Sequence, residues 1–329
     1  MVTFAYIGHG RCSTRAMSNV AHRLLVGLLV SAAALAPAAC AAESSETADT
    51  NEAALEDARP HVLSLGDSIT FAWNPHVESD LRKVDPKKYP GFADLLGEHL
   101  GVPVDNAGCP GEASGSMLDA HAEDNGCRTN RATYPLHYAW STPTGEAPAT
   151  QAEFATAYLQ KAIAEGHPPE LITLTIGGND LLLLQKHCTL PGFVNAGCKL
   201  ARLPFYVHDY GEHIAALVRT VDATGYRGTM VIVTTYAPDY SDAIATFALG
   251  QMNSELSEHV QSVSGELHGL QVRVADGYGA FKAYADQHGG KTCETGLLIK
   301  NDDGKTCDIH PTAAGHRVLA DAILKAAGS

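Results

Sequence analysis

The sequence predicts an α/β fold, a three-layer α/β/α sandwich on a five-stranded parallel sheet. Short apolar segments rich in strand-forming residues recur at wide intervals, and segments with helical periodicity separate them. Strands that alternate with helices pair in parallel, with helices on both faces of the sheet. The 329 residues, 45% of them hydrophobic, suffice for one such domain.

Most of the predicted strands are apolar nearly throughout, as strands covered on both faces must be. They are residues 61–65, 102–106, 171–176, 230–235 and 272–275. The predicted helices are residues 90–100, 151–165, 208–222, 242–267 and 311–327. Because no repeat and no change of composition follows residue 60, we expect a single domain over residues 60–329.

One connection, residues 109–150, is longer than ordinary and carries Tyr134, His137, Tyr138 and Trp140 among glycines and prolines. Loops of that length are usually functional or held by covalent bridges. The aromatic side chains either form a wall of a substrate pocket or pack the loop onto the core. The sequence leaves both open.

Residues 1–42 are predicted to be an export signal peptide. His22 and Arg23 precede an apolar stretch, and small residues follow it. The stretch is too short for a spanning helix, which needs about 20 apolar residues. The alternative is a buried N-terminal helix. We therefore expect a secreted, extracellular protein.

Cys40 leaves the mode of export open. The residues before it resemble a bacterial lipoprotein signal, except that Pro37 stands where an aliphatic residue is usual. The protein is then either lipid-anchored at the outer face of the cytoplasmic membrane or freely secreted. Residues 43–59 are polar and acidic without apolar periodicity, which predicts a disordered tether.

The charge excludes one class of partner. The chain has 37 acidic and 23 basic residues and a formal charge of −14. Because an acidic surface repels phosphates, we expect no nucleic acid partner.

Six cysteines lie after residue 60, an even number in an exported chain, and the oxidising compartment favours disulfides. Since they fall in three close pairs, we expect sequential bridging. The expected bridges are Cys109–Cys127, Cys188–Cys198 and Cys293–Cys307. There is no Cys-x-x-Cys and no His-x-x-x-His, so we expect no metal and no cofactor.

Polar motifs follow the first three predicted strands, where parallel sheets place their ligand sites. Ser68 ends the motif Gly-Asp-Ser after the first strand and opens a helix, so it is either a nucleophile or part of a helix cap. Gly108 follows the second strand and could donate its backbone N–H to an oxyanion, or merely form a turn. Asn179 follows the third strand, and its amide is a neutral donor suited to an oxyanion.

A histidine precedes the last predicted helix. His310 stands before Pro311 and Thr312, beyond the fifth predicted strand. Such a position suits the general base that a serine hydroxyl needs. The four motifs together predict a hydrolase site formed by Ser68, Gly108, Asn179 and His310, although each alone is weak.

This pattern resembles the SGNH, or GDSL, hydrolase superfamily, and the segments around Cys109 and Cys127 are similar to secreted actinobacterial lipase and esterase members. The resemblance covers residue 61 to the C-terminus. It implies a flavodoxin-like fold and a serine esterase or lipase. It also implies Ser68 as the nucleophile, His310 as the base, and Ser68, Gly108 and Asn179 as the oxyanion hole. We expect a monomer that acts on a small-molecule or lipid ester. The signature Gly-x-Ser-x-Gly is absent around Ser68, which argues against the α/β-hydrolase class.

The sequence departs from the family at one position. The family's aspartate stands three residues before the histidine, where this chain has Cys307, and Asp308 stands two before. Either Asp308 orients His310, or a backbone carbonyl near Cys307 does so in a Ser–His dyad.

Two other functions use the same residues or fold. A carbohydrate O-deacetylase would need the identical constellation, and a non-catalytic envelope-binding protein could retain the fold. The acyl length and the alcohol of the substrate are not given. No long apolar lid is apparent, which favours accessible substrates over action at a lipid interface.

Overall fold

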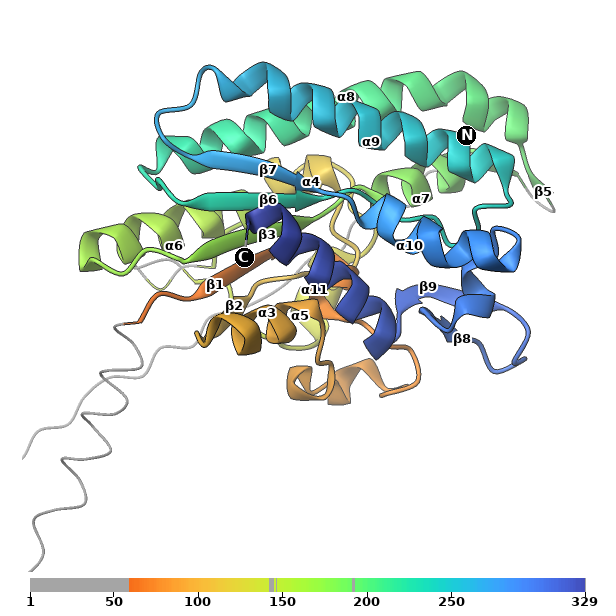
Figure 1. Cartoon of the computed structure of the whole chain (residues 1–329), viewed down its shortest axis with the longest axis horizontal. Coiled ribbons are helices and arrows are strands. Elements are labelled where there is room, and N and C mark those ends of the chain that lie inside the picture. Colours follow the sequence, from red (N-terminus) through yellow and green to blue (C-terminus); the bar gives the residue numbers. More distant parts are fainter. Residues whose placement is uncertain (1–58, 142–144, 146, 191–192, 329) are drawn as a thin grey trace, which may run out of the picture. The chain divides into compact units, whose positions relative to one another are not determined.

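The computed structural model describes residues 59–328, apart from 142–144, 146 and 191–192. The predicted signal peptide and nearly all of the predicted tether lie outside the described residues. The predicted fold class is confirmed by a five-stranded sheet in which every strand is parallel (Figure 1). Its strands, in spatial order, are β2 Val104–Asn106, β1 Val62–Gly66, β3 Leu171–Thr175, β6 Thr229–Val233 and β7 Gln271–Ala275.

The strand order places a crevice beside β1. The chain moves outward from β1 to β2, then crosses back to β3 on the other side of β1 and continues to β6 and β7. Connections that leave a sheet in opposite directions open a crevice at the carboxyl ends of the two strands, and ligands bind there. The ends of β1 and β3 are therefore where this topology predicts a site, and Gly66 pairs with Thr175 at that level.

Helices cover both faces of the sheet (Figure 1). Those on one face are α3 Phe92–Leu100, α10 Gly277–Ala285 and α11 Ala313–Ala327. Those on the other face are α6 Gln151–Glu165, α8 Ala196–Ala223 and α9 Ala243–Ser264. Strand side chains alternate between the two cores, so that Val231 and Val233 pack with the first set while Met230 and Ile232 pack with the second.

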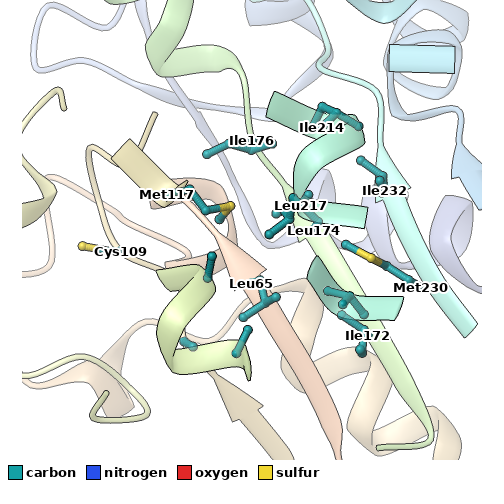
Figure 2. Close-up of a cluster of buried hydrophobic side chains, with 14 of the residues drawn as sticks. Leu65, Cys109, Met117, Ile172, Leu174, Ile176, Ile214, Leu217, Met230 and Ile232 are labelled. Carbon is teal, nitrogen blue, oxygen red and sulfur yellow. The ribbon is translucent and has the colours of Figure 1, made fainter. Parts of the chain in front are cut away.

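Figure 2 shows the second core at the centre of the sheet. Leu174 of β3 and Ile232 of β6 lie near Ile214 and Leu217 of α8, and all four side chains are almost completely buried. Full burial of such a side chain is worth roughly 1.5–3 kcal/mol. This packing stabilises the middle of the sheet, which supports the loops at its carboxyl edge.

The sequence set no bounds for several elements, although it placed the start of a helix at Ser68. The short helices are α2 Ser68–Phe71, α4 Ser114–Leu118, α5 Cys127–Thr133 and α7 Gly178–His187. Two hairpins occur as well, formed by β4 Thr189–Leu190 with β5 Phe193–Val194 and by β8 Leu298–Lys300 with β9 Cys307–Pro311. These helices have between four and ten residues and the hairpin strands between two and five, so they carry too few apolar repeats for a periodic pattern to reveal them.

Helix α8 begins at Ala196, well before the predicted start at residue 208. The side chain of Asn195 caps it by accepting a hydrogen bond from the Cys198 N–H at 3.0 Å. Pro204 lies inside the helix, where a proline normally predicts a break. Some residues in these added turns line the cavity described below.

The long segment 109–150 packs onto the core. The Trp140 indole N–H donates to the Ala107 carbonyl at 3.0 Å, and its ring stacks on Phe154 of α6. Tyr134 stacks on Trp73 and is almost fully buried. Among the described residues of this segment, none lines the cavity described below. The alternative in which its aromatic side chains wall a substrate pocket is therefore not supported.

Three disulfide bridges join the cysteines in sequential order, as expected. They are Cys109–Cys127, Cys188–Cys198 and Cys293–Cys307. No helix in the described part of the chain is long and apolar enough to cross a membrane.

Candidate active site

Ser68 is the first residue of α2, directly after β1. The side chain of Asp67 caps this helix by accepting from the Ile69 N–H at 2.9 Å. The Ser68 hydroxyl lies 2.8 Å from Nε2 of His310, a hydrogen-bond distance. The structure thus brings together two residues at opposite ends of the domain, in the geometry that lets an imidazole take a hydroxyl proton.

The turn before Ser68 is fixed by the backbone of Gly66. This glycine has φ +134°, and a Cβ there would lie 2.1 Å from the Thr175 carbonyl oxygen, so no other residue fits. The buried side-chain amide of Gln151 binds both backbone groups of Gly66, accepting from its N–H at 2.6 Å and donating to its carbonyl at 3.0 Å. Sequence analysis missed Gln151, because it read only as the start of α6.

Asp308 and His310 lie on strand β9. Residues two apart in a strand point to the same side, which brings the Asp308 carboxylate to Nδ1 of His310. The His310 backbone N–H also donates to this carboxylate at 3.0 Å. Partial burial would raise the pKa of Asp308, but the hydrogen bonds from His310 outweigh it and hold the pKa below its usual value. Of the two orienting groups left open by the sequence, the carboxylate is the one in contact.

The hairpin that carries His310 is anchored at several points, including a hydrogen bond between His76 Nε2 and the Lys300 carbonyl at 2.7 Å. The buried Tyr236 donates its hydroxyl proton to the Ile309 carbonyl at 2.6 Å, and its ring stacks on Phe281. The bridge Cys293–Cys307 ties the start of β9 to the preceding segment. Neither Tyr236 nor Phe281 belonged to a recognisable motif, so the sequence gave no signal of this role.

Asn179 lies in the first turn of α7, after β3. Its amide nitrogen donates to the Glu112 carbonyl at 2.8 Å, and its oxygen accepts from the Asn125 amide at 2.9 Å. An amide nitrogen carries two protons, so one N–H of Asn179 remains without a recorded partner in the described part of the chain. Asn179 also lines the cavity beside Ser68. Asn125 holds it in place, a role that sequence analysis missed.

The prediction for Gly108 is wrong. Its N–H donates to the side-chain oxygen of Asn106 at 3.0 Å, and so is not available to an oxyanion. A Cβ at Gly108 would lie 2.6 Å from the Phe71 nitrogen, and Asn106 also donates to the Thr70 carbonyl at 2.7 Å. The motif after β2 therefore clamps helix α2, and with it Ser68, against the neighbouring strand.

Buried acids surround the nucleophile. Asp67, Glu112 and Asp180 are all nearly inaccessible. Burial raises the pKa of Asp67 to about 7, with the charge of Asp180 adding to the effect, and burial likewise raises the pKa of Glu112 to about 7. Asp180 accepts two hydrogen bonds from Ser114, and burial raises its pKa too. Of these acids, Asp180 joins α7 to α4 through its bonds from Ser114, and Asp67 caps α2.

A cavity of about 350 Å³ opens beside Ser68 and Asn179. Its walls come from α7, α8, the end of β6, and α9, and most of the side chains are aliphatic. Examples are Leu184, Leu203, Val233 and Leu249. Such a cavity accepts an apolar chain and offers little to a polar one.

The described residues contain one cluster with metal-ligating side chains, Cys109, Glu112 and Cys127. Both sulfur atoms are joined in a disulfide, so neither is a thiolate that could bind a metal.

Residues 64–318 match the sequence profile of the GDSL-like lipase/acylhydrolase family. The chain belongs to this family. The match spans β1 to α11 and includes every residue of the geometry above. Members of the family cleave esters, and this GDSL-like protein is an ester hydrolase of the esterase and lipase type.

Solved structures of similar fold include three hydrolases, each matched by 82% of this chain. A phospholipase A1 from Streptomyces albidoflavus is 17% identical, with all of that chain covered and a TM-score of 0.49. An acetylxylan esterase from Geobacillus stearothermophilus is also 17% identical, with 94% covered and a TM-score of 0.48. An α/β hydrolase from the Lake Arreo metagenome is 19% identical, with 96% covered and a TM-score of 0.47. No curated protein sequence matches the chain.

Proposed function

We propose that this chain is an exported serine esterase that hydrolyses carboxylic esters with apolar acyl chains. The observation that carries the proposal is the Ser68 hydroxyl, which lies 2.8 Å from His310 Nε2 and at the wall of an aliphatic cavity. Family membership supplies the reaction class. The geometry supports the assignment of roles.

In this mechanism the Ser68 oxygen attacks the ester carbonyl carbon while Nε2 of His310 takes the hydroxyl proton. Asp308 accepts from Nδ1–H, which fixes the tautomer and stabilises the imidazolium that forms. The C–O bond to the alcohol then breaks, and His310 gives its proton to the departing alkoxide. Water, deprotonated by His310, attacks the acyl-enzyme, and the acid leaves as Ser68 regains its proton.

Two donors serve the oxyanion in this proposal, the Ser68 backbone N–H and the second amide N–H of Asn179. We assign the backbone N–H of Gly111 as the third, in place of Gly108. Gly111 adopts φ +91° beside Glu112, whose carbonyl binds Asn179, and no hydrogen bond from its N–H is recorded among the described residues. A structure of the phosphonylated enzyme tests this: a phosphoryl oxygen bound to the Gly108 N–H instead would refute it.

The cavity favours an esterase or lipase over a carbohydrate deacetylase. Acetate needs little room, whereas about 350 Å³ of aliphatic space binds a longer acyl chain through apolar burial. Ala248 lines this space. We expect Ala248→Phe to reduce kcat/KM for p-nitrophenyl octanoate at least tenfold while p-nitrophenyl acetate is still hydrolysed. Equal losses for both esters, or faster release of acetate from acetylated xylan than of fatty acid from lipid esters, would favour the deacetylase.

Export is supported by the signal-like N-terminus and by three disulfides in the mature domain. Lipid attachment at Cys40 and free secretion predict different products. Mass spectrometry of the N-terminus of protein from the native host distinguishes a diacylglyceryl cysteine from an unmodified cut.

The central experiment replaces the nucleophile. We expect Ser68→Ala to abolish hydrolysis of p-nitrophenyl esters and labelling by a fluorophosphonate, with unchanged thermal unfolding. Ser254→Ala, an exposed serine on α9, is the matched control and should retain both. Activity retained by the Ser68 variant would overturn the assignment.

A further inference from the structure

The hairpin β8–β9 is irregular where it carries the acid and base of the proposed mechanism. Its register shifts between the pairs Leu298–Pro311 and Lys300–Cys307. Over that interval β8 has one residue and β9 has three, residues 308–310, so that β9 bulges there. Bulges disrupt the hydrogen bonds between strands and turn side chains in a new direction. Contacts from outside the hairpin must therefore help to hold this bulge in place.

The hairpin is also separate from the sheet that carries the nucleophile. Strands β8 and β9 form a two-stranded sheet of their own, whereas Ser68 directly follows β1 of the five-stranded sheet. The distance between the Ser68 oxygen and His310 Nε2 therefore depends on how two distinct segments are joined. A polar link between these segments would set that distance.

His76 provides such a link. Its Nε2 lies 2.7 Å from the Lys300 carbonyl oxygen, and because a carbonyl only accepts, the ring donates here. Its Nδ1 lies 3.5 Å from the carboxylate of Asp302, which is almost fully exposed. Apart from the serine–histidine bond described above, these are the polar contacts recorded between residues 67–90 and the hairpin in the described part of the chain. An ion pair with so exposed a carboxylate is worth little, so the bond to Lys300 is the stronger of the two.

The chain between Ser68 and His76 follows an unusual path. Ala72 caps the end of α2 with a φ of +61°, and it is the one residue other than glycine with a positive φ in the described part of the chain. The Trp73 N–H donates to the Ser68 carbonyl at 2.9 Å, which closes this turn. The side chain of Asn74 then accepts from the His76 N–H at 3.0 Å. An alanine in the left-handed region is strained, and strained residues cluster at functional sites, which supports a functional role for the place that this turn gives His76.

His76 also lies within electrostatic reach of Asp308. Partial burial raises the pKa of Asp308, the hydrogen bonds that it accepts lower the pKa more, and the charge of His76 adds to the lowering. The Lys300 carbonyl belongs to β8, at the pair that precedes Asp308. On β9, Tyr236 donates to the Ile309 carbonyl inside the bulge. The bulge is thus held from both strands of the hairpin, by His76 on one and Tyr236 on the other.

We propose that His76 is a positioning residue for catalysis, which fixes the bulge of β9, and with it the distance between His310 and Ser68, by binding the Lys300 carbonyl. The inference rests on the proposed function and adds to it a residue that is bonded to neither Ser68 nor His310. A displacement of about 1 Å between reacting groups can lower a rate about 100-fold. Because water replaces part of an exposed hydrogen bond, we expect a smaller effect here.

The test compares two uncharged side chains of similar reach. The amide of His76→Gln can still donate to the Lys300 carbonyl, whereas His76→Met cannot. We expect His76→Met to lower kcat for p-nitrophenyl butyrate about tenfold with KM within about twofold, and His76→Gln to keep at least about half of the wild-type kcat. Labelling of Ser68 by a fluorophosphonate should slow in parallel with kcat, since it needs the same proton transfer. Thermal unfolding should be the same for both variants.

His99→Met is the control, because His99 is an exposed histidine in the last turn of α3. It should match wild type in kcat and in labelling. A kcat for His76→Met within about twofold of wild type, or equal losses in His76→Met and His76→Gln, would overturn the proposal. A loss that appears only together with a lower unfolding temperature would indicate a structural role and overturn it too.

Failure of the proposed function gives a different result. Activity retained by Ser68→Ala refutes the nucleophile itself. If Ser68→Ala is inactive while His76→Met is fully active, the esterase mechanism stands and only the positioning role is refuted.

Discussion

The two halves of the active site are held in opposite ways. Ser68 and Asn179 lie in a buried network, where Gln151, Asn106 and Asn125 fix the backbone and amides and the acids have raised pKa values. Asp308 and His310 lie on a partly exposed hairpin, where the acid has a lowered pKa. The nucleophile is thus held by several buried amide side chains, whereas the base is held by contacts at a partly exposed hairpin, among them those from Tyr236, His76 and the Cys293–Cys307 bridge.

The sharpest test of the base half is Asp308→Asn. An amide cannot hold the imidazole in the required tautomer, and the corresponding change in the chymotrypsin-type triad lowers kcat by about 10⁴. We expect a loss of that order in kcat for p-nitrophenyl butyrate, with KM little changed. A loss below tenfold would mean that His310 is oriented without a carboxylate, as in a dyad.

The nucleophile half is tested by Asn179→Ala. Removal of one oxyanion donor typically lowers kcat by about 100- to 1000-fold. Asn125→Ala leaves that donor present but unheld, so we expect a smaller loss. A loss in the Asn125 variant as large as that in the Asn179 variant would contradict the expected redundancy of the buried network.

Opening the disulfides Cys293–Cys307 and Cys188–Cys198 should change kcat to different degrees. Opening Cys293–Cys307 with two serines removes an anchor of β9, and we expect the free energy of unfolding to fall by about 3 kcal/mol, with a drop in kcat. Opening Cys188–Cys198 should also destabilise the protein while leaving kcat for p-nitrophenyl acetate nearly unchanged. Urea unfolding and steady-state kinetics measure both. Equal kcat losses would show that the hairpin is not especially dependent on its bridge.

The raised pKa of Glu112, in the buried half of the site, predicts that the free energy of unfolding depends on pH. Its folded pKa of about 7 lies above the unfolded value of 4.5, so the unfolded state releases its proton first as the pH rises. The free energy of unfolding should therefore fall between about pH 4.5 and 7, by up to about 3 kcal/mol for this group. Glu112→Gln should give a shallower fall in urea unfolding at several pH values. Asp308 acts in the opposite sense, since its contribution is lost as the pH falls through its lowered pKa.

The smallest expected effect concerns the clamp on α2. Gly108→Ala places a methyl group against the Phe71 nitrogen and Thr70, and overpacking of this kind costs about 1–3 kcal/mol. Gly250→Ala is the control, because a Cβ there meets nothing within 4 Å in an exposed part of α9. It should stabilise the helix by up to about 1 kcal/mol. A Gly108 variant as stable as wild type would show that the surrounding residues shift to accommodate the methyl group.

Much of the fold was predictable because most strands of a buried parallel sheet appear in the sequence as short, nearly continuous apolar segments. Ser68 and Asn179 were placed for a related reason, since they follow those strands, whereas His310 was recognised before the last helix and lies on the hairpin strand β9. Gly108 was misassigned because a glycine after a strand looks the same whether its N–H faces a ligand or Asn106. Gln151 and Tyr236 were invisible, since their roles arise from contacts with residues 85 and 73 positions away.

The predicted preference for accessible substrates rested on the absence of a long apolar lid. No finding tests it, so it stays a prediction. The start of α8 was missed because Pro204 lies inside the helix, where a proline normally predicts a break.

The three disulfides lie in the supports of the site and none in the sheet. One holds the segment of Glu112 and Asn125, one the entrance of α8, and one the strand of His310. Without these bridges the sheet and its two cores would keep their burial, while the segments around the site would each lose a covalent support. For the exported enzyme proposed above, formation of the three bridges would therefore complete the supports of the site.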